Sequence, residues 1–288
     1  MITELHEQDS FSITAVCAAL GVARSTYYAN CSESAHSAAD RELGDQVEEI
    51  FREHRSRYGS RRIAQELARR GVSCGRPRVR RIMSQRGLKA LKTPRQFVPR
   101  TSDGGASAPA PNLLLDRETP TAIDEVWVAD ITYIPVAGLP WLYLAMVMDL
   151  YSRRIIGWRL GPDLRAGLAV GALASAITKR APVAEGLVAH SDQGSQYGSA
   201  AYRRRLESIR ALQSMSRRGN CYDNAFIESC FGTIKDEMLE RGEFDSAEDA
   251  RTELFDYIEI YYNRKRIHSS LGGIPPEEFE TKKQQTKS

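Results

Sequence analysis

Three carboxylates lie in or beside apolar stretches of the sequence, where burying an acid is unfavourable, and so they are the first candidates for catalytic residues. Asp130 lies inside the apolar run 126–133, whose β-branched and aromatic residues predict a strand. Asp192 follows a second apolar run at its carboxyl end, a usual place for functional groups on an α/β sheet. Glu228 borders the apolar stripe of a long predicted helix. A buried carboxylate needs a metal or a partner, so convergence of the three on one point would serve a metal site.

Phosphodiester cleavage is the chemistry that such a group of carboxylates supports. Two Mg²⁺ ions about 3.5 to 4 Å apart activate the attacking oxygen and stabilise the leaving oxygen, so no protein nucleophile is required. Mg²⁺ prefers oxygen ligands and keeps several waters, so three carboxylates with DNA phosphate oxygens suffice, and we expect Mn²⁺ to substitute. Because the chain holds 37 acidic residues, the spacing alone is weak evidence, and its context has to decide.

The elements that must position these carboxylates follow an α/β order. Three strand-like runs come first, joined by short turn-rich segments, which indicates an antiparallel meander. Helices and short strands then alternate. We therefore expect an RNase H-like fold with a mixed sheet. The expected strands are 126–133, 141–149, 154–160, 186–189 and 211–215, and the expected helices are 165–179, 199–207 and 223–240.

A change in composition separates this part of the chain from what precedes it. Residues 99–122 are rich in Pro, Gly, Ser and Ala and are predicted to form a linker. We predict the catalytic domain at 123–280 and a disordered tail at 281–288. Before the linker we predict two small all-α parts, a helix-turn-helix region at 1–38 and a basic helix-turn-helix DNA-binding domain at 39–98.

Positive charge is concentrated in the second of these all-α parts. The formal net charge is only +3, but from Arg52 to Arg100 there are 16 Lys and Arg against two Asp and Glu, a net of +14. Neutralisation of DNA phosphates explains such a block. A disordered basic arm or a solvated surface is the alternative, which the helical patterning disfavours. The candidate DNA contacts in the block are Arg61, Arg62, Arg78, Arg80 and Arg81.

Three polar residues near the carboxylates are further candidates for DNA contacts. His190 lies two residues before Asp192, where a backbone contact is an equally good interpretation. Asn224 lies four residues before Glu228, on the same face of the predicted helix. Lys235 follows Glu228 by seven residues, about two turns, so both side chains project from nearly the same edge. A solvated lysine is the alternative for Lys235.

The composition also excludes several classes of protein. No run approaches the roughly 18 apolar residues that a membrane span needs, and the first residues lack a secretory signal pattern. We therefore expect a cytoplasmic protein with no membrane partner. The five cysteines are scattered and form no C-x-x-C pair, which argues against a disulfide framework and a thiolate zinc site.

Stretches around all three carboxylates closely resemble the catalytic motifs of bacterial insertion-sequence transposases of the DDE type. The stretches are 127–133 (WVADITY), 190–197 (HSDQGSQY) and 219–229 (GNCYDNAFIES). Thirty-five residues separate Asp192 from Glu228, as in that family and in the retroviral integrase core that it resembles. The resemblance extends to 58–63 (YGSRRI) and to Tyr262, Asn263, Arg266, His268, Ser270, Leu271 and Pro276, so it covers nearly the whole chain.

The resemblance implies a catalytic subunit encoded as a downstream frame, OrfB, behind a small OrfA. It implies that Asp130, Asp192 and Glu228 bind two Mg²⁺ ions and catalyse hydrolysis at the ends of an element, followed by attack of the new 3′-hydroxyl on another phosphodiester. Lys235 would hold the terminal base pairs. The expected partners are double-stranded DNA, both terminal repeats and target, further copies of the chain in a homo-oligomer on DNA, and an OrfA partner or fusion.

Two other functions stay open at this point. A DNA-binding regulator would keep the basic domain and lack catalysis. An RNase H-type nuclease would share the metal chemistry but only hydrolyse, and the basic helix-turn-helix domain argues against it.

Overall fold

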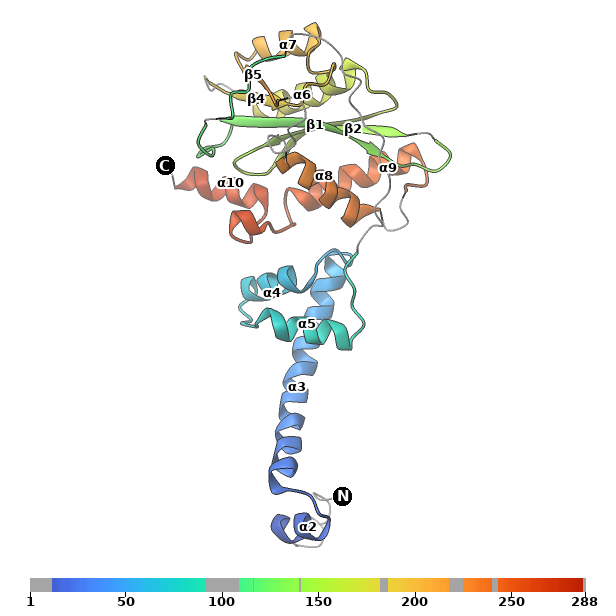
Figure 1. Cartoon of the computed structure of the whole chain (residues 1–288), viewed down its shortest axis with the longest axis vertical. Helices are drawn as coiled ribbons and strands as arrows, with labels where there is room; N and C mark the ends of the chain where they lie inside the picture. Colours follow the sequence, from blue (N-terminus) through green and yellow to red (C-terminus); the bar gives the residue numbers. More distant parts are fainter. Residues whose placement is uncertain are drawn as a thin grey trace. The chain divides into compact units, whose positions relative to one another are not determined.

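The chain forms two compact units, Met1–Ala90 and Leu91–Ser288 (Figure 1). The structure is a computed structural model that describes residues 12–91, 109–115, 117–139, 141–181, 186–217, 225–239 and 243–286, and for residues 29–38 and 225 it describes only the backbone. Within these ranges no helix is both long enough and apolar enough to span a membrane.

All helices and strands that the structure describes in the N-terminal unit are α-helices. Its helices are α2 (Ile13–Ala19), α3 (Arg24–Glu53), α4 (Ser60–Arg69) and α5 (Arg76–Gln85). The predicted boundary between residues 38 and 39 lies within α3, which continues across it. The stretch 29–40 contains neither Pro nor Gly, so nothing in the backbone stops the helix there.

A small apolar core joins α3, α4 and α5. The helix pair predicted within the basic block is confirmed, since its apolar residues Ile63, Leu67, Val79, Ile82 and Met83 are all buried. Residues of α3 that recur three or four positions apart complete the core. Arginines are left on the outer faces of the two short helices.

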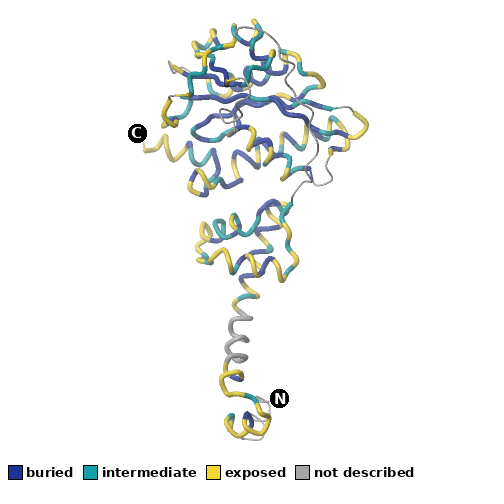
Figure 2. The backbone as a smooth tube through the Cα atoms, in the orientation of Figure 1, coloured by how far each residue is buried: buried dark blue, intermediate teal, exposed yellow. Residues whose placement is uncertain are grey.

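The C-terminal unit is built on a mixed five-stranded sheet, as expected for an RNase H-like fold. The strands are β1 (Val126–Ile134), β2 (Leu142–Asp149), β3 (Ile155–Gly161), β4 (Val188–Ser191) and β5 (Leu212–Met215). Their order is β3-β2-β1-β4-β5, in which β1, β2 and β3 are antiparallel and β4 and β5 run parallel to β1. Figure 2 shows that the strands are largely buried, because helices cover both faces.

Successive residues of β1 point to opposite faces of the sheet, and this alternation separates the core from the site. Trp127, Ala129 and Ile131 belong to the apolar cluster under α6 (Ala166–Arg180) and α7 (Ala200–Glu207). The helix α8 (Ala225–Met238) packs against β1, and its Lys235 reaches Thr132. The even-numbered residues of β1, Asp130 among them, therefore face the α8 side.

The C-terminal segment is helical almost to its end. It comprises α9 (Ala247–Phe255), the π-helix η2 (Asp256–Tyr262), the short 3₁₀-helix η3 (Ser269–Leu271) and α10 (Pro276–Gln285). The predicted disordered tail is wrong for residues 281–285, which continue α10. The helix is anchored by Glu280, which is 3 % exposed and pairs with Arg154 and Arg180.

Part of the predicted linker packs on the sheet. The backbone N–H of Leu113 donates to Ser214 Oγ at 2.9 Å, and the N–H of Met215 donates to the carbonyl of Pro111 at 3.3 Å. The segment 109–115 therefore lies against β5, although its proline content predicted a connection. Residues 92–108 and 116 of the linker region lie outside the described residues.

The contact between β3 and α6 leaves no room for a side chain at Gly157. A Cβ there would lie 2.3 Å from the carbonyl oxygen of Ala172 and 2.6 Å from the backbone nitrogen of Ala176. Because these are backbone atoms, we expect Gly157→Ala to lower the free energy of unfolding by about 1 to 3 kcal/mol in urea denaturation. The matched control is Gly167→Ala in the first turn of α6, where a Cβ meets nothing within 4 Å and should stabilise by about 0.5 to 1 kcal/mol. Equal effects of the two changes would contradict this packing.

Candidate active site

The parallel pairing of β1 with β4 sets Asp130 beside Asp192. Ala129 pairs with Ser191, the last residue of β4, so the two aspartates take the next position in the same register. Neighbouring strands lie about 4.8 Å apart, which brings their side chains within electrostatic reach. Asp130 is partly exposed, whereas the other eight residues of β1 are buried.

Helix α8 supplies the third carboxylate. Ile227, Phe231 and Ile234 are buried and fix the apolar face of the helix, which leaves Glu228 on the exposed edge as predicted. Lys235, two turns further, donates to Thr132 Oγ1 at 2.8 Å and ties the same edge to β1. This contact lies two residues along β1 from Asp130.

The three carboxylates interact electrostatically, which supports their convergence. Burial, the charge of Asp192 and the charge of Glu228 raise the pKa of Asp130 to about 8, against the N–H of Ile131 and the charge of Lys235. The pKa of Asp192 is raised by burial. Burial and the charge of Asp192 raise the pKa of Glu228. Like charges held this close favour a bound cation, because a cation relieves their repulsion.

The donor chemistry of these residues fits a hard divalent cation. Carboxylate oxygens are the ligands that Mg²⁺ prefers, and its remaining positions take water or phosphate. Among the residues that the structure describes, no three His, Cys, Asp or Glu side chains stand close enough together to surround a metal ion. The three carboxylates are thus near enough to interact electrostatically, but their side chains do not surround a single point as metal ligands would.

Two residues that follow Asp192 also belong to this region, and the sequence predicted no individual role for either, although both lie in the stretch 190–197. A Cβ at Gly194 would lie 2.9 Å from Asp192 Oδ1 and 2.4 Å from Gln196 Oε1, so glycine lets these polar groups approach. Tyr197 is 2 % exposed, and its hydroxyl has no hydrogen-bond partner among the described residues. Burial and the charges of Asp130 and Asp192 raise the pKa of Tyr197. The signal available in the sequence was the polar run that continues past Asp192.

The structure gives different environments to the other polar residues that the sequence predicted as DNA contacts near the carboxylates. His190 is fully buried, and its Nδ1 lies 2.8 Å from Ser214 Oγ on β5, so the ring links two strands, which favours the structural interpretation of this residue over a DNA contact. Lys235 is partly buried, and burial lowers its pKa while Asp130 raises it, so it is not a solvated lysine. Asn224 lies outside the described residues.

The arginines of the N-terminal unit differ in whether they form ion pairs. Asp40 on α3 accepts from Arg78 Nε at 2.7 Å and from Arg81 Nη2 at 2.6 Å. Arg62 lies over the ring of Tyr58, 5.5 Å from its centroid. Arg80 is exposed and, within the described part of the chain, takes part in no ion pair. Arg61 is exposed and also lacks an ion pair among the described residues.

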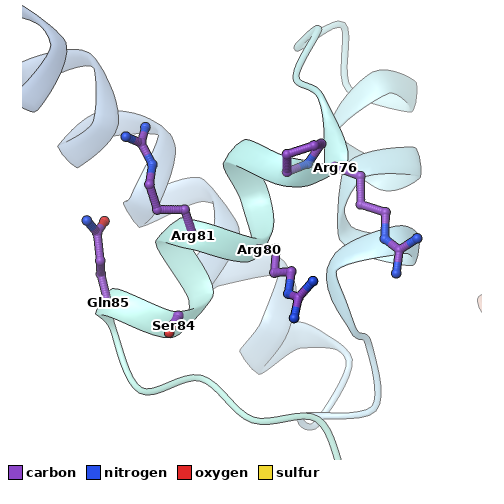
Figure 3. A pocket seen from close by; sticks show the side chains of 6 residues that line it. Arg76, Arg80, Arg81, Ser84 and Gln85 are labelled. Carbon is purple, nitrogen blue, oxygen red and sulfur yellow. The ribbon is translucent and has the colours of Figure 1, made fainter.

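A hollow of about 520 Å³ lies along the outer face of α5. Figure 3 shows Arg81 directed towards α3 and Arg80 directed to the opposite side. The hollow is lined by Arg76, Pro77, Arg80, Arg81, Ser84 and Gln85. This surface offers guanidinium, hydroxyl and amide groups, which are the groups that contact phosphates and base edges.

Comparison with protein families matches most of both units. Residues 120–221 and 210–276 match integrase core domain families, and residues 38–97 match the HTH-like domain. The chain is 39% identical over 272 residues to the insertion element IS600 uncharacterized 31 kDa protein of Shigella sonnei, covering 93% of this chain and 98% of that protein. It is 37% identical over 283 residues to transposase InsF for insertion sequence IS3A of Escherichia coli (strain K12), covering 97% of each.

Among other relatives and solved structures, the transposase for insertion sequence element IS904 of Lactococcus lactis subsp. lactis (strain IL1403) is 40% identical over 83% of this chain and 93% of its own length. The HTLV-2 integrase catalytic core domain in complex with magnesium aligns with a TM-score of 0.42 at 14% identity, over 55% of this chain and 96% of that one. The BIV integrase catalytic core aligns with a TM-score of 0.43 at 17% identity, over 57% and 98%.

The raised pKa of Asp130 predicts how the stability of the metal-free protein depends on pH. Between the ordinary value of 3.8 and about 8, the unfolded chain has lost this proton and the folded chain keeps it, so the free energy of unfolding falls as pH rises. Asp130→Asn removes this loss. In EDTA we expect the variant to exceed the parent at pH 8 by about 1 to 3 kcal/mol, and by less at pH 5.

Thermal denaturation at both pH values measures this difference. Asp163→Asn, at an exposed position of the same unit, is the matched control and should follow the parent. If the difference in stability between Asp130→Asn and the parent were the same at pH 8 and at pH 5, Asp130 would not be buried beside Asp192 and Glu228.

Proposed function

Because the chain belongs to the insertion-sequence transposases and combines an HTH-like domain with an integrase core, we propose that Asp130, Asp192 and Glu228 are the residues with which it cuts and joins DNA. The enzyme is a DDE transposase, a polynucleotidyl transferase that acts in DNA transposition. The observation that carries the assignment is the electrostatic coupling of these three carboxylates across β1, β4 and α8.

The proposed reaction has two phosphoryl transfers at one site. In the first, a water oxygen bonds to phosphorus at the end of the element and the 3′ oxygen leaves as a hydroxyl. In the second, this hydroxyl attacks another phosphodiester, whose own 3′ oxygen leaves. A pair of Mg²⁺ ions, when bound, would activate the attacking oxygen and stabilise the leaving one.

The protein's own part is to hold the carboxylates in place. Asp130 Oδ1 accepts from the N–H of Ile131 at 2.8 Å, and Asp192 Oδ1 accepts from the N–H of Gly194 at 2.9 Å. These bonds orient both carboxylates before a cation arrives. Lys235 adds a positive charge beside Asp130, and its place on the edge of α8 that carries Glu228 supports a role in holding the DNA next to the reacting phosphate.

Double-stranded DNA is the partner that fits the N-terminal unit. We assign the contact to the outer face of α5, centred on Arg80, with Arg61 on α4 as a further phosphate contact. Arg78 and Arg81 would act chiefly by fixing α5 on α3 through Asp40. Homo-oligomerisation on DNA and a partnership or fusion with OrfA also belong to the proposal.

Removal of a catalytic carboxylate should separate chemistry from binding. We expect Glu228→Ala to reduce cleavage and joining of labelled element ends in Mg²⁺ below detection, because the ion loses a ligand while the N-terminal unit still binds phosphates. The matched control is Asp236→Ala, an exposed acid on the same helix, which should keep its activity. A Glu228→Ala protein that nicks at the parental rate would refute the assignment.

The same assay of the parent protein tests the two alternative functions. Joined strands in the parent reaction exclude a purely hydrolytic nuclease, and any metal-dependent nicking excludes a silent regulator.

The division of the arginines predicts unequal effects on DNA affinity. Arg80→Ala should flatten the slope of log affinity against log salt by about 0.9 if it contacts a phosphate, or cost roughly 1 to 3 kcal/mol and relax sequence preference if it contacts a base. Arg52→Ala, on an exposed face of α3, is the matched control and should leave the slope near the parental value. Fluorescence anisotropy with element-end duplexes at several salt concentrations measures both. Identical slopes for Arg80→Ala and the parent would place the contact elsewhere.

A further inference from the structure

The face of α8 opposite the active site carries a buried acid. Glu237 follows Glu228 by nine residues, which at about 100° per residue turns it roughly half a revolution away. Its side chain is 5 % exposed. A carboxylate in such a place is unfavourable unless charged or hydrogen-bonded partners satisfy it.

Two residues of the C-terminal segment donate hydrogen bonds to both carboxylate oxygens of Glu237 and so fix the orientation of its side chain. Arg266 donates from Nη2 to Oε1 at 2.9 Å and from Nε to Oε2 at 3.0 Å, in a bidentate pair. The hydroxyl of Tyr257 donates to Oε2 at 2.8 Å. Burial lowers the pKa of Arg266, but the charge of Glu237 outweighs this effect and raises the pKa, so Arg266 keeps its charge in the pair.

A second contact lies on the same stripe of α8. Cys230, seven residues before Glu237, donates from Sγ to the hydroxyl of Tyr262 at 3.3 Å. Tyr257 and Tyr262 are five residues apart, which in an α-helix would turn them about 140° from each other. The π-helix η2 changes this, since the N–H of Asn263 bonds the carbonyl of Ile258, five residues earlier, at 3.2 Å. The wider turn lets both tyrosines reach α8.

The segment that holds α8 is itself fixed to the sheet. Asn263 Nδ2 donates to the carbonyl of Ile155 at 2.9 Å, and its Oδ1 accepts from the N–H of Ile155 at 3.0 Å. All of these groups are buried. A continuous set of directional contacts therefore runs from the start of β3 through η2 to the rear of α8.

We infer that Tyr257, Asn263 and Arg266 form a brace that fixes the rotation of α8 about its axis and so holds Glu228 towards Asp130 and Asp192. They are positioning residues, since Tyr257 and Arg266 act through Glu237 on the opposite face of α8, and Asn263 ties their segment to β3. Apolar packing alone is non-directional and would tolerate a turn of the helix, whereas a bidentate ion pair does not. The inference rests on the proposed function for its effect on rate, but its structural part stands without it.

The test compares the brace with a second buried ion pair of the same unit. Glu280 of α10 pairs with Arg180 of α6 and with Arg154, and its described contacts do not include α8. The variants are Glu237→Gln, Arg266→Lys and Tyr257→Phe, with Glu280→Gln as the matched control. Each is measured for thermal midpoint, for Mg²⁺-dependent cleavage rate at saturating DNA, and for hydrogen exchange of the α8 amides without metal.

We expect Glu237→Gln and Glu280→Gln to lose similar thermal stability. Only Glu237→Gln should slow cleavage at saturating DNA, by about tenfold to a hundredfold, because a small displacement of a reacting group has effects of that size. The KM for DNA should stay within roughly twofold of the parent. Arg266→Lys should keep part of the rate, since it retains the charge and loses the bidentate geometry.

Tyr257→Phe decides the matter if the charge variants do not fold, because it keeps the ion pair and removes one hydrogen bond. It should speed exchange of the α8 amides, whereas Glu280→Gln should not. Unchanged exchange in α8, or equal slowing of cleavage by Glu237→Gln and Glu280→Gln, would overturn the inference. A parent protein that does not cleave would refute the proposed function alone, because the exchange measurement still tests the brace.

Discussion

The register of the parallel pair β1–β4 is the constraint on which the site depends. It places Asp130 and Asp192 side by side, and the same ladder directs Trp127, Ala129 and Ile131 into the core under α6. A slip of one residue would turn the carboxylate into that core and expose apolar side chains on the other face. The packing that stabilises the sheet and the geometry that serves the chemistry are therefore fixed by one set of backbone hydrogen bonds.

Four acids of the C-terminal unit differ in their partners. Glu237 and Glu280 are each paired with arginine, which neutralises them and turns them into structural links. Asp130 and Asp192 accept backbone N–H groups and remain under mutual repulsion with raised pKa values. The first kind holds helices in place without chemistry, whereas the second stores unfavourable electrostatic energy that a divalent cation would relieve.

In the N-terminal unit, the net charge counted along the sequence overstates the positive charge that is available to bind DNA. The basic block carries few acids of its own, but α3 brings Asp40, Asp45 and Glu48 against it. Arg86 bridges the last two, and Asp40 holds both Arg78 and Arg81. The arginines that α3 leaves exposed, such as Arg80, therefore bear more of the proposed DNA binding than the net charge suggests.

Apolar periodicity and local motifs depend on neighbours along the chain, so the sequence alone was enough to predict the order of strands and helices and the helix pair of the basic block, and to propose the triad. The prediction missed that α3 continues through residues 29–38, although neither Pro nor Gly interrupts it there. It also missed the helix through residues 281–285, which is anchored by the pairing of Glu280 with arginines that are distant in sequence. Only the tertiary structure decided that His190 is buried and that Asp40 pairs two arginines. It also assigned Arg266 to the rear of α8. Each is a contact between segments far apart in the chain, and no local pattern encodes which side chains will meet.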